Sequence, residues 1–161
     1  MFAWALNGKD IDGGSVSCTG VQIASVLDLL GSTDVLRSAT WYAGRLDVIG
    51  APQFLDHFDD HLSVVPCLAE LIESLRSKPQ LMDGIFVASD VAYASSLSGA
   101  KLTPPSRPIG RLLESSMVEV VAFDTSWIEI YGDDGEIIEL LRSQYGGRSL
   151  LPLDRVAGPK D

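Results

Sequence analysis

One short run of the sequence contains the residue types that metal-dependent chemistry requires. It extends from Asp56 to His61 and holds two histidines and three aspartates. If this run is helical, His57 and His61 lie one turn apart on the same face, with Asp60 beside them. Imidazole and carboxylate groups in that arrangement are ligands for a divalent metal ion. The run therefore predicts a candidate metal site at His57, Asp60 and His61.

The same run also has a simpler interpretation. The histidine spacing is similar to that of the zinc-protease motif His-Glu-x-x-His, but Phe58 occupies the position of the general-base glutamate. No third ligand outside the run can be assigned from the sequence. We therefore favour a short solvated helix over 53–62 that carries two ordinary histidines. A small metal-dependent hydrolase that uses His57, Asp60 and His61 stays open as the alternative.

The other patterns that could support catalysis are incomplete. The pairs Asp59/Asp60 and Asp133/Asp134 are adjacent in sequence, whereas acid–base catalysis by two carboxylates needs them across a cleft in different environments. Asp133 or Asp134 is better suited to cap a helix. No serine lies in a Gly-x-Ser-x-Gly elbow, and no glycine-rich loop has phosphate-binding spacing. The sequence predicts no cofactor.

The charge balance narrows the class of partner. Acidic residues outnumber basic ones by 22 to 12, for a net charge of -10 at pH 7. Such a field repels nucleic acid and anionic membranes and attracts basic partners. No apolar run approaches the roughly 20 residues of a membrane-spanning helix, and the first residues lack the basic start of a signal peptide. We expect a cytoplasmic protein that binds neither nucleic acid nor membranes.

Hydrophobic periodicity divides most of the chain into strands and helices. The clearest strands are 118–123 and 127–131, whose short connection favours an antiparallel hairpin. Apolar residues at helical spacing predict a helix that Thr19 caps. The other predicted strands are 2–6, 40–49 and 81–88, and Gly44 marks either a bulge or a close backbone approach. The other predicted helices follow Pro66 and Gly135.

These elements predict a single α+β domain over residues 1–161. We expect a mixed or antiparallel sheet of about five strands packed by three to four helices. The Ser-, Ala- and Pro-rich segment 89–106 is predicted to be a long loop. The segment 148–161 is predicted to be a partly ordered tail.

For Trp127 and for the two cysteines, the sequence leaves open whether the side chain is buried in the core or exposed at the surface. Trp127 lies on a predicted strand, where packing in the core is the ordinary role. If it points outward it becomes a candidate anchor, because tryptophan is enriched in interface hot spots. Cys18 and Cys67 match no metal or redox spacing, and we expect both to be buried as small apolar side chains.

The C-terminal third resembles a known group of proteins. The run from Val118 to Tyr131, followed by Asp133-Asp134 and by a helix that stops at Gly146-Gly147, is similar to the C-terminal part of small acidic bacterial immunity proteins encoded beside secreted toxins. The resemblance implies a protein partner, a cognate toxin domain, that is inhibited by steric occlusion.

Charge, missing catalytic patterns and resemblance together predict a non-catalytic binding protein. We expect an immunity or inhibitor protein whose contacts are Trp127 as anchor and six acidic residues: Asp56, Asp59, Asp60, Asp133, Asp134 and Glu136. Two alternatives stay open: the metal-dependent hydrolase and a regulatory module that works as a homodimer or larger homo-oligomer.

Overall fold

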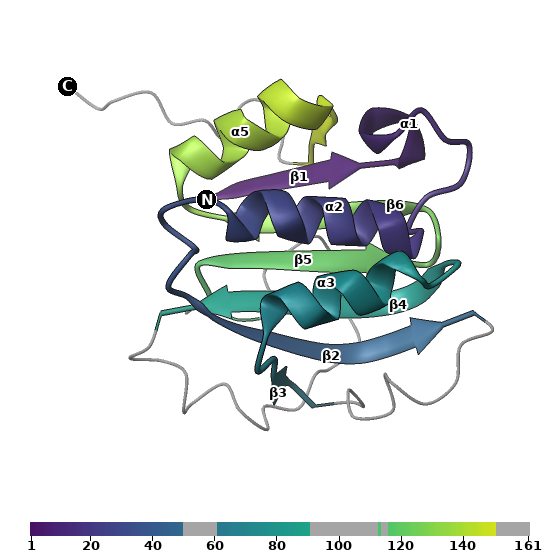
Figure 1. Ribbon diagram of the computed structural model, residues 1–161. Helices are drawn as coiled ribbons and strands as arrows, with labels where there is room; N and C mark the ends of the chain where they lie inside the picture. The colour runs from purple at the N-terminus through teal and green to yellow at the C-terminus, as the bar shows by residue number, and fades with distance from the viewer. Residues whose placement is uncertain (50–60, 91–112, 114–115, 151–161) are drawn as a thin grey trace.

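A seven-stranded antiparallel sheet organises the described part of the chain, residues 1–49, 61–90, 113 and 116–150 of the computed structural model (Figure 1). The strand order is β3-β2-β4-β5-β6-β1-β7. The strands are β1 (Phe2–Leu6), β2 (Thr40–Val48), β3 (Ser63–Val64), β4 (Leu81–Ser89), β5 (Val118–Phe123), β6 (Trp127–Gly132) and β7 (Arg148–Ser149). The helices in these residues are α1 (Gly8–Ile11), α2 (Gly20–Gly31), α3 (Leu68–Arg76) and α5 (Gly135–Tyr145). The α+β class is confirmed, and all strand pairs among the described residues are antiparallel.

The described sheet has two more strands than the five expected. The two additional strands are the edge strands, which are too short to be recognised in the sequence. β3 and β7 have two residues each, and an alternating pattern needs about four residues to be recognised. β7 pairs with Trp4 and Ala5 of β1, so the segment expected to be a tail begins as a strand. Residues 151–161 lie outside the described residues.

The predicted long loop 89–106 is only partly described. Ser89 is the last residue of β4 and is fully buried. Residues 91–106 lie outside the described part of the chain. The short helix α1 was not expected. The Asn7 side chain accepts from the amides of Lys9 and Asp10 and so starts a helical turn.

Helix capping follows the sequence closely. Thr19 caps α2 by accepting from the amide of Gln22, whose side chain accepts in return from the Thr19 amide. Asp134 caps α5 by accepting from the amide of Glu136 at 2.7 Å. Both caps satisfy helix-end donors that have no intrahelical partner. The predicted capping roles of Thr19 and Asp134 are confirmed.

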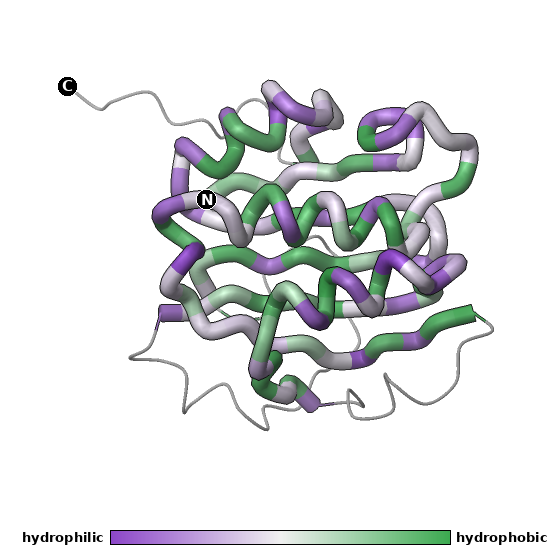
Figure 2. The backbone as a smooth tube through the Cα atoms, in the orientation of Figure 1, coloured by the Kyte–Doolittle hydropathy of each residue, from purple (hydrophilic) through white to green (hydrophobic). Residues whose placement is uncertain are grey.

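One face of the sheet is covered by α2, α3 and α5. Leu27 of α2, Leu75 of α3 and Leu141 of α5 are fully buried in the same cluster as Phe86 of β4. Figure 2 shows hydrophobic and hydrophilic residues alternating along α3, as expected for a helix with one buried side. Gly20 lets α2 approach α3, because a Cβ there would lie 2.0 Å from the Leu75 carbonyl oxygen. We call this side the helix-covered face.

The opposite side of the sheet, the second face, has a separate core. Val87, Val121 and Tyr131 belong to it and alternate along their strands with residues of the helix-covered face. Tyr42 and Ile85 complete its centre, and Leu150 packs against it. The sheet is therefore buried on both sides across its middle strands.

The hairpin of β5 and β6 is confirmed, and its turn is strained. Phe123 pairs with Trp127, and their rings stack with centroids 5.7 Å apart. Between them, Asp124 and Thr125 have φ of 41° and 56°. A left-handed backbone is unusual for a β-branched residue such as Thr125.

The two cysteines differ in exposure. Both are free thiols; Cys18 is buried and Cys67 is exposed. Burial of Cys67 was therefore the wrong expectation, because this residue stands at the N-cap of α3 and not on its apolar side. Burial raises the pKa of the Cys18 thiol to about 11, although bonds with the backbone of Phe123 and Trp127 partly oppose the shift. In the residues described, no helix has the length and apolar character needed to cross a bilayer.

Candidate functional site

Acidic side chains gather around the beginning of α5. Asp133 pairs with the terminal amine of Met1 at 3.1 Å, and Asp134 is engaged as the helix cap. Glu136 and Glu139 follow on the exposed side of the first turns. Carboxylates near a helix N-terminus are favourable because they face the positive end of its dipole. Helix formation thus places several negative charges together.

These residues border an open groove of about 950 Å³. It lies between α5 and the segment after α2, and we call it the acidic groove. Its lining consists of Val35, Asp134, Gly135, Glu136, Glu139, Leu140 and Ser143. Val35 and Leu140 add apolar surface to the lining, so the groove combines charge with hydrophobic contact.

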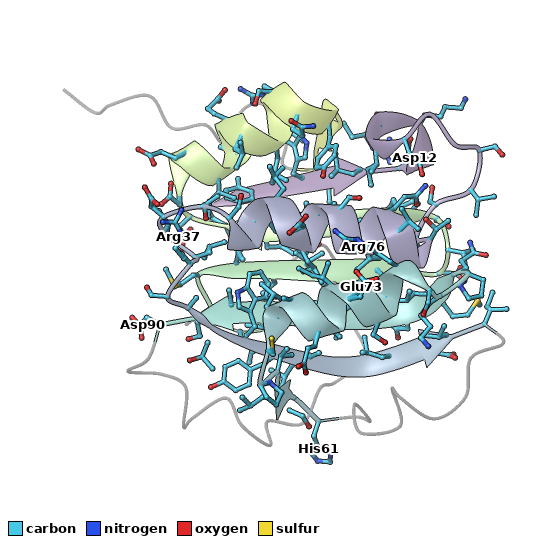
Figure 3. All side chains as sticks on the ribbon, viewed as in Figure 1. Asp12, Arg37, His61, Glu73, Arg76 and Asp90 are labelled. Atoms are coloured by element: carbon cyan, nitrogen blue, oxygen red, sulfur yellow. The ribbon has the colours of Figure 1, made fainter. Side chains whose placement is uncertain are left out.

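The carboxylates of the acidic groove differ in how far they are already engaged. Glu139 accepts from Arg142 at 2.6 Å. The neighbouring Asp34 pairs with Arg37 at 3.0 Å, and Figure 3 shows Arg37 near the start of α5. Glu136 forms no ion pair in the described part of the chain. It is therefore the carboxylate that an incoming cation meets without displacing another one.

Trp127 lies away from the acidic groove. It begins β6, whereas Asp133 follows the end of the same strand. Its indole Nε1 donates to the Glu129 carboxylate at 2.7 Å, and the side chain is half-buried. The structure therefore brings Asp133, Asp134 and Glu136 together but leaves the predicted anchor at the other end of the strand.

The predicted histidine cluster is represented only by His61. Asp56, His57, Asp59 and Asp60 lie outside the described residues. His61 is exposed in a β-bridge next to β3, and in Figure 3 it points outward from the sheet edge. The helix expected over 53–62 is thus wrong at its C-terminal end. Across the described ranges, no three His, Cys, Asp or Glu side chains are grouped as metal ligands.

Sequence reasoning missed two carboxylates on the second face. Glu119 is fully buried, and its Oε1 accepts from the Ser116 hydroxyl at 2.7 Å and from the Leu113 amide at 2.8 Å. Glu129 is 7% exposed, and its two oxygens accept from Trp127 and from the Tyr131 hydroxyl, the latter at 2.5 Å. Charge-assisted bonds of this kind are what permit buried carboxylates.

A signal for this burial was present in the strand pattern. Glu119 shares its face with Val121, and Glu129 shares its face with Tyr131. An exposed face would not carry large apolar residues at alternate positions. Charged residues are seldom fully buried, which is why the two glutamates were not singled out from the sequence.

An ion pair lies near the other end of the second face. The Arg45 guanidinium donates through Nη2 to the Asp83 carboxylate, while its buried Nη1 has no hydrogen-bond partner. Arg45 has φ of 51° in a stretch of β2 where the register shifts after Gly44, which favours the bulge among the two alternatives expected there. Burial raises the pKa of Asp83, and Arg45 partly opposes that shift. Bulges commonly redirect a side chain in this way.

The described geometry thus offers an open acidic surface at one end of β6 and a set of bonded, buried carboxylates on the second face. The first is accessible to a partner, whereas the second fixes the aromatic residues of the sheet. No protein-family model, curated protein or solved structure matches this chain.

Proposed function

We propose that this protein is a non-catalytic inhibitor that neutralises a cognate bacterial toxin, and that its acidic groove receives a basic surface of that toxin. The observation that carries the proposal is the groove itself, which Asp134, Glu136 and Glu139 line together with the apolar side chains of Val35 and Leu140. Inhibition is steric: the bound protein covers the toxin's active cleft, and no bond is made or broken.

Charge and surface chemistry support different parts of this binding. The net charge of -10 speeds encounter with a basic partner through long-range attraction. Once contact is made, apolar residues such as Leu140 supply the buried area that charge alone does not. Glu136 gives specificity, since a partner lysine or arginine can pair with it without breaking an internal ion pair.

The toxin as partner rests on the C-terminal resemblance. The residues that carry it form β5, β6, the Asp134 cap and α5. The same segment forms much of the acidic groove. Sequence likeness and candidate surface therefore fall on one part of the molecule.

A charge reversal with a matched control tests the groove. A basic polypeptide captured from the source cell at moderate salt is purified, and its affinity is measured for wild type, Glu136→Lys and Glu70→Lys. Glu136 and Glu70 are both exposed glutamates in the first turn of a helix, so both changes cost similar helix stability. We expect Glu136→Lys to slow association by about tenfold, with a weaker salt dependence, and Glu70→Lys to leave it unchanged.

Two outcomes separate the parts of the proposal. Equal affinity for Glu136→Lys and Glu70→Lys would show that the acidic groove is not the contact surface. Expression of the captured partner in a host cell tests the toxin assignment. Growth arrest that co-expression of this chain relieves supports the assignment, and unimpaired growth contradicts it.

A further inference from the structure

A small pocket lies at the end of β1 that is far from the acidic groove. It has a volume of about 190 Å³, which is the space of roughly six water molecules. Four separate segments meet there: the end of β1, the start of α1, the β5–β6 turn and the start of β7. The lining residues are Ala5, Leu6, Asn7, Asp10, Ser126, Trp127, Gly147 and Arg148.

The backbone around this pocket is closely packed. Gly147 has φ of 86°, and a Cβ there would lie 2.6 Å from both Leu6 Cδ2 and Trp4 Nε1. The Trp4 indole itself donates to the Gly146 carbonyl at 2.7 Å. These contacts fix the chain that carries Arg148 against the end of β1, so the pocket has a defined wall.

Capping determines which polar atoms remain available on one side of the pocket. Asn7 Oδ1 accepts from the amides of Lys9 and Asp10, so the Nδ2 donor group is directed elsewhere. Asp10 Oδ2 accepts from the Asn7 amide at 2.8 Å, which leaves Oδ1 as an acceptor. The Ser126 hydroxyl donates to the Asp124 carbonyl at 3.0 Å, so its lone pairs also remain.

Opposite charges line the pocket without neutralising each other. Arg148 and Asp10 both contribute to it, and they form no ion pair with one another in the described structure. An anion bound at Arg148 is opposed by Asp10 and by the net charge of -10. A simple cation bound at Asp10 is opposed by Arg148. A ligand that carries both charges avoids both penalties.

We propose that this pocket binds a small zwitterion of the free α-amino acid class. Its carboxylate takes the donors of Arg148 and Asn7 Nδ2, and its ammonium group takes the acceptors of Asp10 and Ser126. The indole of Trp127, held by its bond with Glu129 at 2.7 Å, packs against the ligand's side chain. The site is independent of the proposed inhibitor function and lies at the opposite end of β6.

Three probes test the charge requirement. L-alanine carries both charges, alaninamide lacks the carboxylate and N-acetyl-L-alanine lacks the ammonium group. Each is titrated to about 10 mM, tenfold above the roughly 1 mM dissociation constant plausible for so few atoms. Binding is followed by the NMR shifts of the Trp127 indole N–H and of the Ser126 and Gly147 amides. We expect saturable shifts with alanine and at least tenfold weaker binding of either analogue.

Variants connect the binding to the named groups. Arg148→Gln removes the cation, and Asp10→Asn removes the anion but keeps an oxygen for the Asn7 amide; we expect each to weaken alanine binding at least tenfold. Arg37→Gln and Glu70→Gln change exposed charges outside the pocket and should leave the binding unchanged. Three results would overturn the proposal: no shift with alanine, alaninamide binding as tightly as alanine, or full affinity in Arg148→Gln.

Discussion

The two faces of the central sheet are buried by different means. On the helix-covered face, fully buried residues such as Leu27 and Leu75 pack three helices onto the strands mainly through apolar contact. On the second face, Glu119 and Glu129 are buried among aromatic and aliphatic residues. Apolar contact tolerates changes of shape, whereas a buried carboxylate needs its donors in place. The two faces should therefore respond to mutation by different rules.

The largest effect is expected from removing apolar volume on the helix-covered face. Leu27 is fully buried on α2, and Leu27→Ala should lower the free energy of unfolding by about 2–5 kcal/mol through lost burial and a cavity. Urea denaturation measures the change. Val21, which is 49% exposed on the same helix, provides the control. Alanine is the better helix former at both positions, so an equal loss in Val21→Ala would mean that the effect does not depend on burial in the core.

On the second face, hydrogen bonds should matter more than volume. Glu129→Leu keeps much of the side-chain size but removes the carboxylate that accepts from the Trp127 indole and the Tyr131 hydroxyl. We expect a loss of about 1–3 kcal/mol. Glu129→Gln should recover most of it, since an amide accepts from the indole and donates to the hydroxyl. Equal unfolding free energies for Glu129→Leu and Glu129→Gln would show that hydrogen bonding does not distinguish the second face from the helix-covered face.

The Arg45–Asp83 pair should give the second face a pH dependence. The pKa of Asp83 is raised above its usual 3.8, chiefly by burial, so the folded state holds this proton more tightly than the unfolded state. The resulting stabilisation is fully present below pH 3.8 and is lost as pH rises through the raised pKa. Asp83→Asn lacks this titration, while the loss of charge beside Arg45 adds an offset that does not vary with pH.

Urea unfolding at a series of pH values measures this dependence. The stability of wild type relative to Asp83→Asn should fall as pH rises through the raised pKa. Asp34→Asn is the control, because it also removes a carboxylate paired with an arginine, but an exposed one. Its stability relative to Asp83→Asn should fall with pH as that of the wild type does. A difference between wild type and Asp83→Asn that stays constant with pH would refute the expected direction.

The smallest effect is expected at the turn that joins β5 to β6. Thr125 has φ of 56°, and Asn tolerates this region better than a β-branched residue does. Thr125→Asn should therefore stabilise the protein by about 0.5–1 kcal/mol, measured as a rise in Tm. Thr125→Val keeps the branching and should give no gain. A gain shared by both variants would point to the removed hydroxyl and not to backbone strain.

Local signals account for the parts of the fold that were predicted correctly. The Thr19 and Asp134 caps and the β5–β6 hairpin each depend on residues within a few positions of one another. The misses depend on distant partners. β7 has two residues and exists because Trp4 and Ala5 present an edge to it. His61 is extended next to β3 and not helical.

The candidate site divides in the same way. Clustering of Asp133, Asp134 and Glu136 could be predicted because these residues are adjacent and open a helix. Their separation from Trp127 could not, because it depends on the direction of β6. The apolar side chain of Val35 joins the acidic groove from the segment after α2, and nothing in its local sequence indicates this.

By itself, the sequence determined the charge, the α+β class, the main helices and the central hairpin, because composition, periodicity and capping act over short distances. Tertiary structure alone decided that Tyr42 and Tyr131 share one core on the second face, and that Asp10 and Arg148 line one pocket. Those outcomes depend on which strands become neighbours. Strand pairing joins residues that lie far apart in the chain, and no local pattern encodes it.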